Sequence, residues 1–205
     1  NLKIFFPISI AISLVIIFYF FDYKDIILIL GLLFSIYLIV SVIFDWISQK
    51  KLSLNFGRLV SHLGFGTLIF AIFVNAYLSK EINAAMKVGE EITIQEFVIK
   101  FKSINRIKKE NYEEVFGNFL VTNKKKQVEL TPSIRKYDQP VQFTSETSIK
   151  TNFIVDYYFA INLSEFEKDK IMVRFYYKPL MFWIWFSILL IAFGGIYQTF
   201  RLRNE

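Results

Sequence analysis

The segment Arg174-Phe175-Tyr176-Tyr177-Lys178-Pro179-Leu180-Met181-Phe182-Trp183-Ile184-Trp185 joins two kinds of sequence. Before Pro179, polar and apolar residues alternate as they do in a β-strand with one buried face. After it, about twenty residues follow without a charge until Arg201, which is the length of a helix that crosses a membrane. The segment therefore predicts a junction at which an extramembrane domain passes directly into a membrane span.

The composition of the chain agrees with a membrane protein. Of its 205 residues, 54% are hydrophobic and 24 are Phe, which is more than an ordinary soluble domain carries. Three further apolar runs, at residues 2–21, 26–47 and 59–78, are each near the ~20 residues that cross the hydrocarbon core. We predict a membrane α-helical plus β fold, in which four transmembrane helices carry a small antiparallel β domain between helices three and four.

The domain organisation follows from the same pattern. Residues 1–79 are predicted to form three transmembrane helices, residues 80–178 the β domain, and residues 179–205 the final transmembrane helix and a tail. Within the β segment, hydrophobic residues recur with a period of two, with turn signals about every ten residues, which favours a sandwich or barrel. The predicted core residues are Phe101, Phe119, Val121 and Phe175, and the triplet Lys124-Lys125-Lys126 is predicted to be a hairpin turn.

Charges in the short connections predict the orientation. Lys50, Lys51 and Arg58 lie between the second and third apolar runs, and Arg201 and Arg203 follow the fourth. Short loops rich in Lys and Arg stay in the cytoplasm, so the β segment is predicted to be extracytoplasmic. That segment carries 17 basic and 14 acidic residues in mixed order, which argues against nucleic acid as a partner.

Some classes of chemistry find no support in the sequence. The chain has no cysteine, so it forms no disulfide and no thiolate metal site. No paired carboxylates, phosphate-binding glycine loop or nucleophile elbow occurs at catalytic spacing, so we expect no self-sufficient catalysis. Because the chain begins with Asn1 and its first apolar run is too long for a cleaved signal peptide, we expect a fragment or a split subunit.

The candidate for chemistry inside the membrane is His62, the single histidine, about 6 Å past Arg58 along the third predicted helix. It is either a packing histidine near a helix end or an axial ligand of haem iron. Gly66 lies one turn further on the same face and leaves room for a flat ring. A stripe of mostly small residues on this helix, which includes Ser61 and Gly64, favours close helix packing.

Aromatic and polar residues supply the remaining candidates. Trp183 and Trp185 open the last helix, where they form either an interfacial aromatic belt or the wall of a cofactor cavity. Five residues of the β segment are predicted to dock a partner or to fix loops: Arg135, Tyr137, Glu146, Arg174 and Lys178. Among them, Arg135 and Glu146 are expected to form an ion pair between two loops.

Six short elements, in one order over residues 56–203, resemble the C-terminal half of the CcmF family of cytochrome c-type biogenesis proteins. They are Ser61-His62-Leu63-Gly64, Ile134-Arg135-Lys136-Tyr137, Ser145-Glu146-Thr147-Ser148-Ile149, Asp156-Tyr157-Tyr158, Tyr176-Tyr177-Lys178-Pro179 and Trp183-Ile184-Trp185. The chain departs from the family pattern at Ser133 and Ile134, where the family has an acid and a lysine.

The resemblance implies a part of a membrane haem lyase that attaches haem to apocytochrome c. His62 would be a ligand of haem b, and Gly66, Trp183 and Trp185 would border the cofactor. The implied partners are a haem chaperone, apocytochrome c with a Cys-x-x-Cys-His motif, and an N-terminal haem-handling segment or subunit that this chain lacks. The implied location is the bacterial inner membrane with a periplasmic β domain, or the mitochondrial inner membrane.

A second class of function is also open. A non-enzymatic scaffold, anchored in the membrane, would use the β domain to dock an assembly partner and would need no haem. In that case His62 is a packing residue.

Overall fold

The computed structural model describes residues 2–20, 25–48, 55–124, 126–162 and 170–203. The chain divides into two compact units. The helical unit contains Asn1–Leu78 and Pro179–Glu205, and the β unit contains Ser79–Lys178. The connections with Lys50, Lys51 and Ser53, and the turn at residues 21–24, lie outside the described residues.

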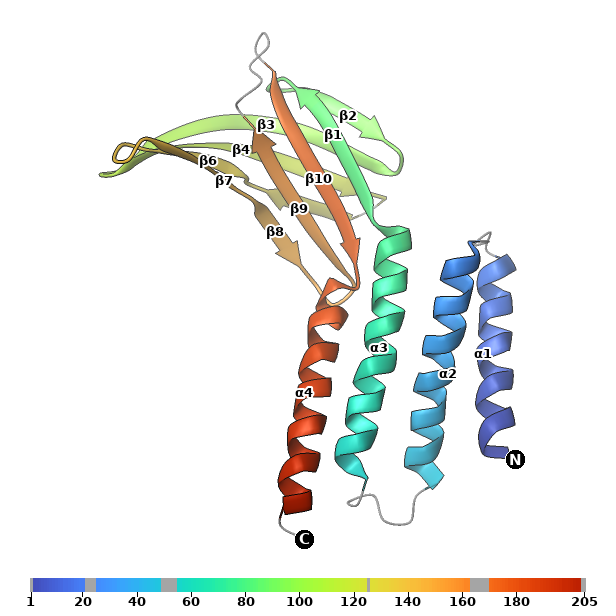
Figure 1. The fold of residues 1–205 in the computed structure, drawn as a ribbon. Helices are drawn as coiled ribbons and strands as arrows, with labels where there is room; N and C mark the ends of the chain where they lie inside the picture. Colours follow the sequence, from blue (N-terminus) through green and yellow to red (C-terminus); the bar gives the residue numbers. More distant parts are fainter. Residues whose placement is uncertain (1, 21–24, 49–54, 125, 163–169, 204–205) are drawn as a thin grey trace. The chain divides into compact units, whose positions relative to one another are not determined.

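The helical unit contains α1 (Leu2–Phe20), α2 (Ile26–Ser48), α3 (Phe56–Leu78) and α4 (Met181–Arg203). They stand side by side in this order (Figure 1). Three of them, α2, α3 and α4, are long and apolar enough to cross a membrane, and α1 is a shorter apolar helix. The side chain of Asp25 caps α2, because its Oδ1 accepts hydrogen bonds from the backbone N–H groups of Ile27 and Leu28.

Small residues bring α3 and α4 close together. A Cβ atom on Gly64 would lie 2.9 Å from the Ser187 carbonyl oxygen, and one on Gly194 would lie 2.5 Å from the Gly57 carbonyl oxygen. The Ser61 hydroxyl donates a hydrogen bond to the Ile191 carbonyl oxygen at 3.1 Å. This confirms the predicted packing role of the small-residue stripe, since only small side chains allow two helix backbones to approach in this way.

The β unit is a sandwich of two antiparallel sheets (Figure 1). One sheet has the order β1-β10-β9-β8, and the other has the order β2-β3-β4-β6-β7 with β5 paired to β4. The strands are β1 (Lys80–Met86), β2 (Glu91–Ile94), β3 (Phe97–Lys108), β4 (Tyr112–Asn123), β5 (Lys126–Leu130), β6 (Ser133–Tyr137), β7 (Gln142–Glu146), β8 (Ser148–Thr151), β9 (Val155–Asn162) and β10 (Ile171–Pro179). The first and last strands of the unit, β1 and β10, pair from Lys80↔Tyr177 to Met86↔Ile171.

Aromatic side chains fill the space between the sheets. The Phe119 ring stacks on Phe101 at 4.3 Å and on Phe159 at 4.4 Å between centroids. Phe175 from β10 packs against the same cluster and is fully buried. All four predicted core residues therefore lie in the core, because alternation in a strand places every second side chain on the buried face.

Some strands have no matching sequence prediction. β1, β6, β7 and β8 are short or polar, and their hydrophobic residues do not alternate clearly. The polar runs that contain β6 and β7 were expected to form loops, but their backbones pair with each other from Ser133↔Glu146 to Tyr137↔Gln142. The predicted hairpin at residues 123–126 is confirmed by the pairing of Asn123 with Lys126, while residue 125 is outside the described part.

Candidate functional site

His62 lies in the second turn of α3, and its ring is held by the backbone of its own helix. Nδ1 is 2.8 Å from the carbonyl oxygen of Arg58. A carbonyl oxygen only accepts hydrogen bonds, so Nδ1 carries the proton and donates it. The tautomer that makes this hydrogen bond has its lone pair on Nε2. The His62 side chain is exposed among the described residues. A backbone carbonyl on the far nitrogen is also how metal-binding histidines are commonly oriented.

The histidine lines a cavity of about 250 Å³ between α2 and α3. Polar groups from both helices surround it, including Tyr37, Ser41 and the Asp45–Arg58 ion pair, whose N···O distance is 3.8 Å. Within the described residues, the Ser41 hydroxyl oxygen is buried without a hydrogen-bond partner. A buried polar atom of this kind has free hydrogen-bonding capacity that a ligand or water can satisfy.

Gly66 lies against α2. A Cβ atom there would lie 2.9 Å from a side-chain carbon of Ile39 on α2. On this side, the room that the glycine leaves is occupied by the neighbouring helix. The glycine allows α2 and α3 to approach closely.

The two tryptophans of α4 lie well away from His62 along the axis of the helical unit. Ser61 is level with Ile191, and Trp183 precedes Ile191 by eight residues, which is about 12 Å along the helix. Trp183 and Trp185 are 37% and 64% exposed. The structure therefore does not bring His62, Trp183 and Trp185 into one pocket.

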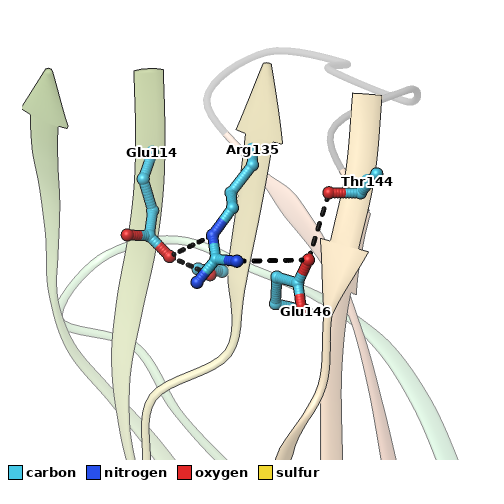
Figure 2. Close-up of polar contacts among 5 residues, drawn as sticks. Glu114, Arg135, Thr144 and Glu146 are labelled. Atoms are coloured by element: carbon cyan, nitrogen blue, oxygen red, sulfur yellow. Dashed lines mark hydrogen bonds and ion pairs between the residues drawn. The ribbon is translucent and has the colours of Figure 1, made fainter. Parts of the chain in front are cut away.

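A polar network crosses three strands of the larger sheet (Figure 2). Oε1 of Glu114 on β4 accepts hydrogen bonds from the Ser133 hydroxyl at 2.7 Å and from Nε of Arg135 at 3.1 Å. Another guanidinium nitrogen of Arg135 lies 3.6 Å from Oε1 of Glu146 on β7, and the Thr144 hydroxyl donates to that oxygen. The predicted Arg135–Glu146 pair is thus present, but it joins adjacent strands instead of two loops.

Electrostatics and ring contacts reinforce the network. The hydrogen bond from Ser133, and then the guanidinium of Arg135, hold the pKa of the Glu114 carboxyl below its ordinary value. Arg135 also lies over the Tyr112 ring, 5.1 Å from its centroid, and Tyr112 contacts Tyr137 at 5.4 Å. The arrangement binds three strands together and leaves a charged, partly exposed surface.

The last two predicted residues, Arg174 and Lys178, lie apart from this network. Arg174 is exposed on β10, opposite Asn83 of β1. The Lys178 ammonium lies 5.7 Å from the centroid of the Tyr176 ring. In the described part of the chain, no group of three His, Cys, Asp or Glu side chains is placed to hold a metal ion.

Sequence reasoning missed the partners of the predicted residues. Asp45, Tyr37 and Ser41 are on a different helix from His62, and Glu114 is 21 residues from Arg135. The sequence around an acidic residue in a polar strand does not identify the basic residue with which it will pair. Only the pairing of β4 with β6, which sets Glu114 opposite Arg135, makes the contact visible.

Comparisons with known proteins give the chain its family context. A family model described as the CcmF C-terminal beta-sandwich matches residues 77–179. The cytochrome c-type biogenesis protein NrfE of Haemophilus influenzae is 27% identical over 162 residues, which are 78% of this chain and 25% of that protein. The cytochrome c-type biogenesis protein CcmF of Escherichia coli K12 is 29% identical over 148 residues, which are 72% and 23%. The chain spans about a quarter of these curated relatives.

A solved structure shares the fold. The protein named Cytochrome c Heme Lyase CcmF superposes with a TM-score of 0.74 over 97% of this chain and 34% of that chain, at 16% identity. Fold and composition thus define a multi-pass membrane protein with an inserted β-sandwich. Since the family model covers half of the chain, the protein belongs to the CcmF family.

Proposed function

We propose that this chain is part of a membrane haem lyase that attaches haem to apocytochrome c. The names of the relatives describe cytochrome c-type biogenesis, and the structural neighbour is named a haem lyase. The observation that carries the proposal within this chain is the hydrogen bond between His62 Nδ1 and the Arg58 carbonyl oxygen. It leaves Nε2 as the one imidazole nitrogen with a free lone pair.

His62 is proposed to be a ligand that would hold the iron of haem b. When bound, haem supplies an iron atom that accepts an imidazole nitrogen as ligand. The cavity beside His62, about 250 Å³, is below the roughly 300–1,000 Å³ of typical ligand sites. Ser41 and Arg58, which line the cavity with His62, would be the polar neighbours of the bound group.

Other parts of the site are proposed to come from outside this chain. A second ligand and the remaining walls would belong to an N-terminal haem-handling segment or subunit. A haem chaperone would deliver the haem, and apocytochrome c would present its Cys-x-x-Cys-His motif. Trp183 and Trp185 are proposed either to border the haem or to anchor α4 at the membrane interface.

We propose that the β unit lies outside the cytoplasm, on the periplasmic side of a bacterial inner membrane, and docks a partner. The polar surface around Arg135, Tyr137 and Glu146 is ordered by the network with Glu114, which supports a role in docking because an already ordered surface loses less entropy when a partner binds. Arg174 and Lys178 are proposed to contribute through their charges.

The haem proposal is tested by replacing His62 in the assembled complex. His62→Ala should lower the haem absorbance per molecule of protein while leaving the amount of membrane-inserted protein unchanged. His62→Gly should regain absorbance when imidazole is added, because the free imidazole takes the vacated ligand position. Full haem content and cytochrome c maturation in His62→Ala would contradict the proposal and favour the non-enzymatic scaffold.

The orientation is tested with single cysteines, because the natural chain has none. Asn123→Cys, in the β4–β5 hairpin, should react with a membrane-impermeant thiol reagent added from outside the cell. Ser53→Cys, in the connection between α2 and α3, should react only after the membrane is opened. Outside labelling of Ser53→Cys but not of Asn123→Cys would reverse the proposed orientation.

A further inference from the structure

The cavity beside His62 is lined by the charged residues of the two helices that form it. α2 carries one acidic residue, Asp45, and no basic one, while α3 carries one basic residue, Arg58, and no acidic one. Both side chains line the same cavity of about 250 Å³. Charged residues are costly in membrane helices, and those that occur there commonly serve a site. This pair therefore gives the cavity a charged wall that an apolar ligand would not need.

Four polar side chains of the cavity come in two pairs of equal spacing. Ser41 and Asp45 are four residues apart on α2, and Arg58 and His62 are four residues apart on α3. Residues at this spacing are neighbours on one face of a helix, so each helix presents two adjacent polar groups to the cavity. On α3, a cation thus lies one turn from the imidazole that is proposed to hold iron.

The guanidinium of Arg58 keeps most of its hydrogen-bonding capacity. One of its nitrogens lies 3.8 Å from an Asp45 carboxylate oxygen, which is an ion pair but is longer than a hydrogen bond. Among the described residues the Arg58 side chain makes no hydrogen bond, although a guanidinium has five N–H donors. The Ser41 hydroxyl oxygen, in the same cavity, is buried without a partner in the described part of the chain. Two donor groups are thus available to an anion.

We propose that Arg58 and Ser41 bind a carboxylate group of the haem whose iron is held by His62. This inference rests on the proposed haem-binding function. Haem b carries two propionate side chains, each of which ends in a carboxylate, and a guanidinium recognises a carboxylate through two parallel N–H donors. Asp45 offers the same chemical group to Arg58 when no haem is bound. The guanidinium would therefore exchange the Asp45 carboxylate for a propionate, which makes Asp45 a competitor.

This exchange predicts opposite effects for the two members of the ion pair. Arg58→Gln removes the cation, so haem b should bind about tenfold more weakly, as expected for the loss of one hydrogen-bonded charge. Asp45→Asn removes the competing carboxylate, so haem b should bind more tightly. If the ion pair only held α2 against α3, either change would weaken the same contact, and both variants would bind haem more weakly.

The test compares haem b with its dimethyl ester, in which both carboxylates are neutral. The assembled complex is purified in detergent from haem-deficient cells and titrated with each haem, and binding is followed by the Soret band. The preference for haem b over the ester should be about tenfold greater in the natural complex than in Arg58→Gln. Arg58→Lys, which keeps the charge but not the paired donors, should be intermediate. Because each preference is a ratio within one preparation, a lower yield of folded variant does not affect it.

The His62→Ala complex separates this inference from the proposed function. Loss of the iron ligand should shift the Soret band with either haem, whereas Arg58→Gln should leave its position unchanged. If Arg58→Gln weakens the binding of both haems equally, or if Asp45→Asn weakens the binding of haem b, the carboxylate site is refuted and the iron ligand stands. If His62→Ala changes nothing while Arg58→Gln still distinguishes the two haems, the iron ligand is refuted instead. Failure of both haems to bind the natural complex would refute both proposals.

Discussion

The two adjacent glycines of α4 should respond in opposite ways to the same substitution. Alanine favours a helix over glycine by about 0.5–1 kcal/mol, and this gain is equal for Gly194→Ala and Gly195→Ala. A Cβ on Gly195 meets nothing within 4 Å, whereas one on Gly194 would lie 2.5 Å from the Gly57 carbonyl oxygen and 2.7 Å from the Ser61 nitrogen. Both of these atoms belong to the α3 backbone and move only with the whole helix.

The steric penalty sets the magnitude. Inserting one carbon into a packed interface costs about 1–3 kcal/mol. An alanine at position 194 would also disturb the hydrogen bond from Ser61 to Ile191. Gly195→Ala should therefore be neutral or stabilising by up to about 1 kcal/mol. The Gly194→Ala variant should be less stable than the Gly195→Ala variant by about 1–3 kcal/mol, since the two differ only in the packing penalty.

Thermal unfolding in nanodiscs, followed by the fluorescence of the native tryptophans, measures the difference. For a chain of this size each kcal/mol corresponds to a shift of about 2–4 °C. Gly194→Ala should have the lower midpoint, and Gly195→Ala should match or exceed the natural chain. An equal or higher midpoint for Gly194→Ala would refute the close α3–α4 contact.

Three further predictions concern the β unit. Phe101→Ala should destabilise it by roughly 3–5 kcal/mol, measured by hydrogen exchange, while Phe143→Ala, at a 63% exposed position, should change little. Because the pKa of Glu114 is lowered in the fold, its carboxylate stabilises the fold above the ordinary carboxyl pKa, and this stabilisation is lost as the pH falls through the folded pKa. Ser133→Ala should therefore raise the pH midpoint of acid unfolding, and an unchanged midpoint would contradict the network. Burial raises the pKa of Asp156, so its ionisation costs stability as the pH rises through the folded pKa. Asp156→Asn should therefore raise the melting temperature at neutral pH but not in acid. An equal rise at both pH values would refute the assignment.

The helices and the aromatic core were predictable from sequence because each depends on a local pattern. Uninterrupted apolar runs identify α2, α3 and α4, since polar residues are costly inside a bilayer. Alternating Phe97, Ile99 and Phe101 identify β3 in the same direct way. Both patterns follow from the period of the backbone and require no knowledge of the neighbouring strand or helix.

The remaining features depend on distant partners. β7 reads Gln142-Phe143-Thr144-Ser145-Glu146 and is a strand because its backbone pairs with β6, which is itself held by β4. Ile39, which lies against Gly66, is on another helix. The sequence shows which residues are small or charged, but their spatial neighbours are set by the tertiary fold.

The pairing of β1 with β10 has a consequence for biosynthesis. The β unit separates α3 from α4 by about a hundred residues, so at ~5–20 residues per second α4 leaves the ribosome about 5–20 s after α3. During that interval, the small-residue face of α3 has no α4 to pack against. Once β1 and β10 have paired, the start of α4 is held near the end of α3. The entropy cost of closing the long loop between the two helices has then already been met by folding of the β unit. Folding of the sandwich should thus favour packing of α4 against α3, and a β unit that folds slowly would delay assembly of the helical unit.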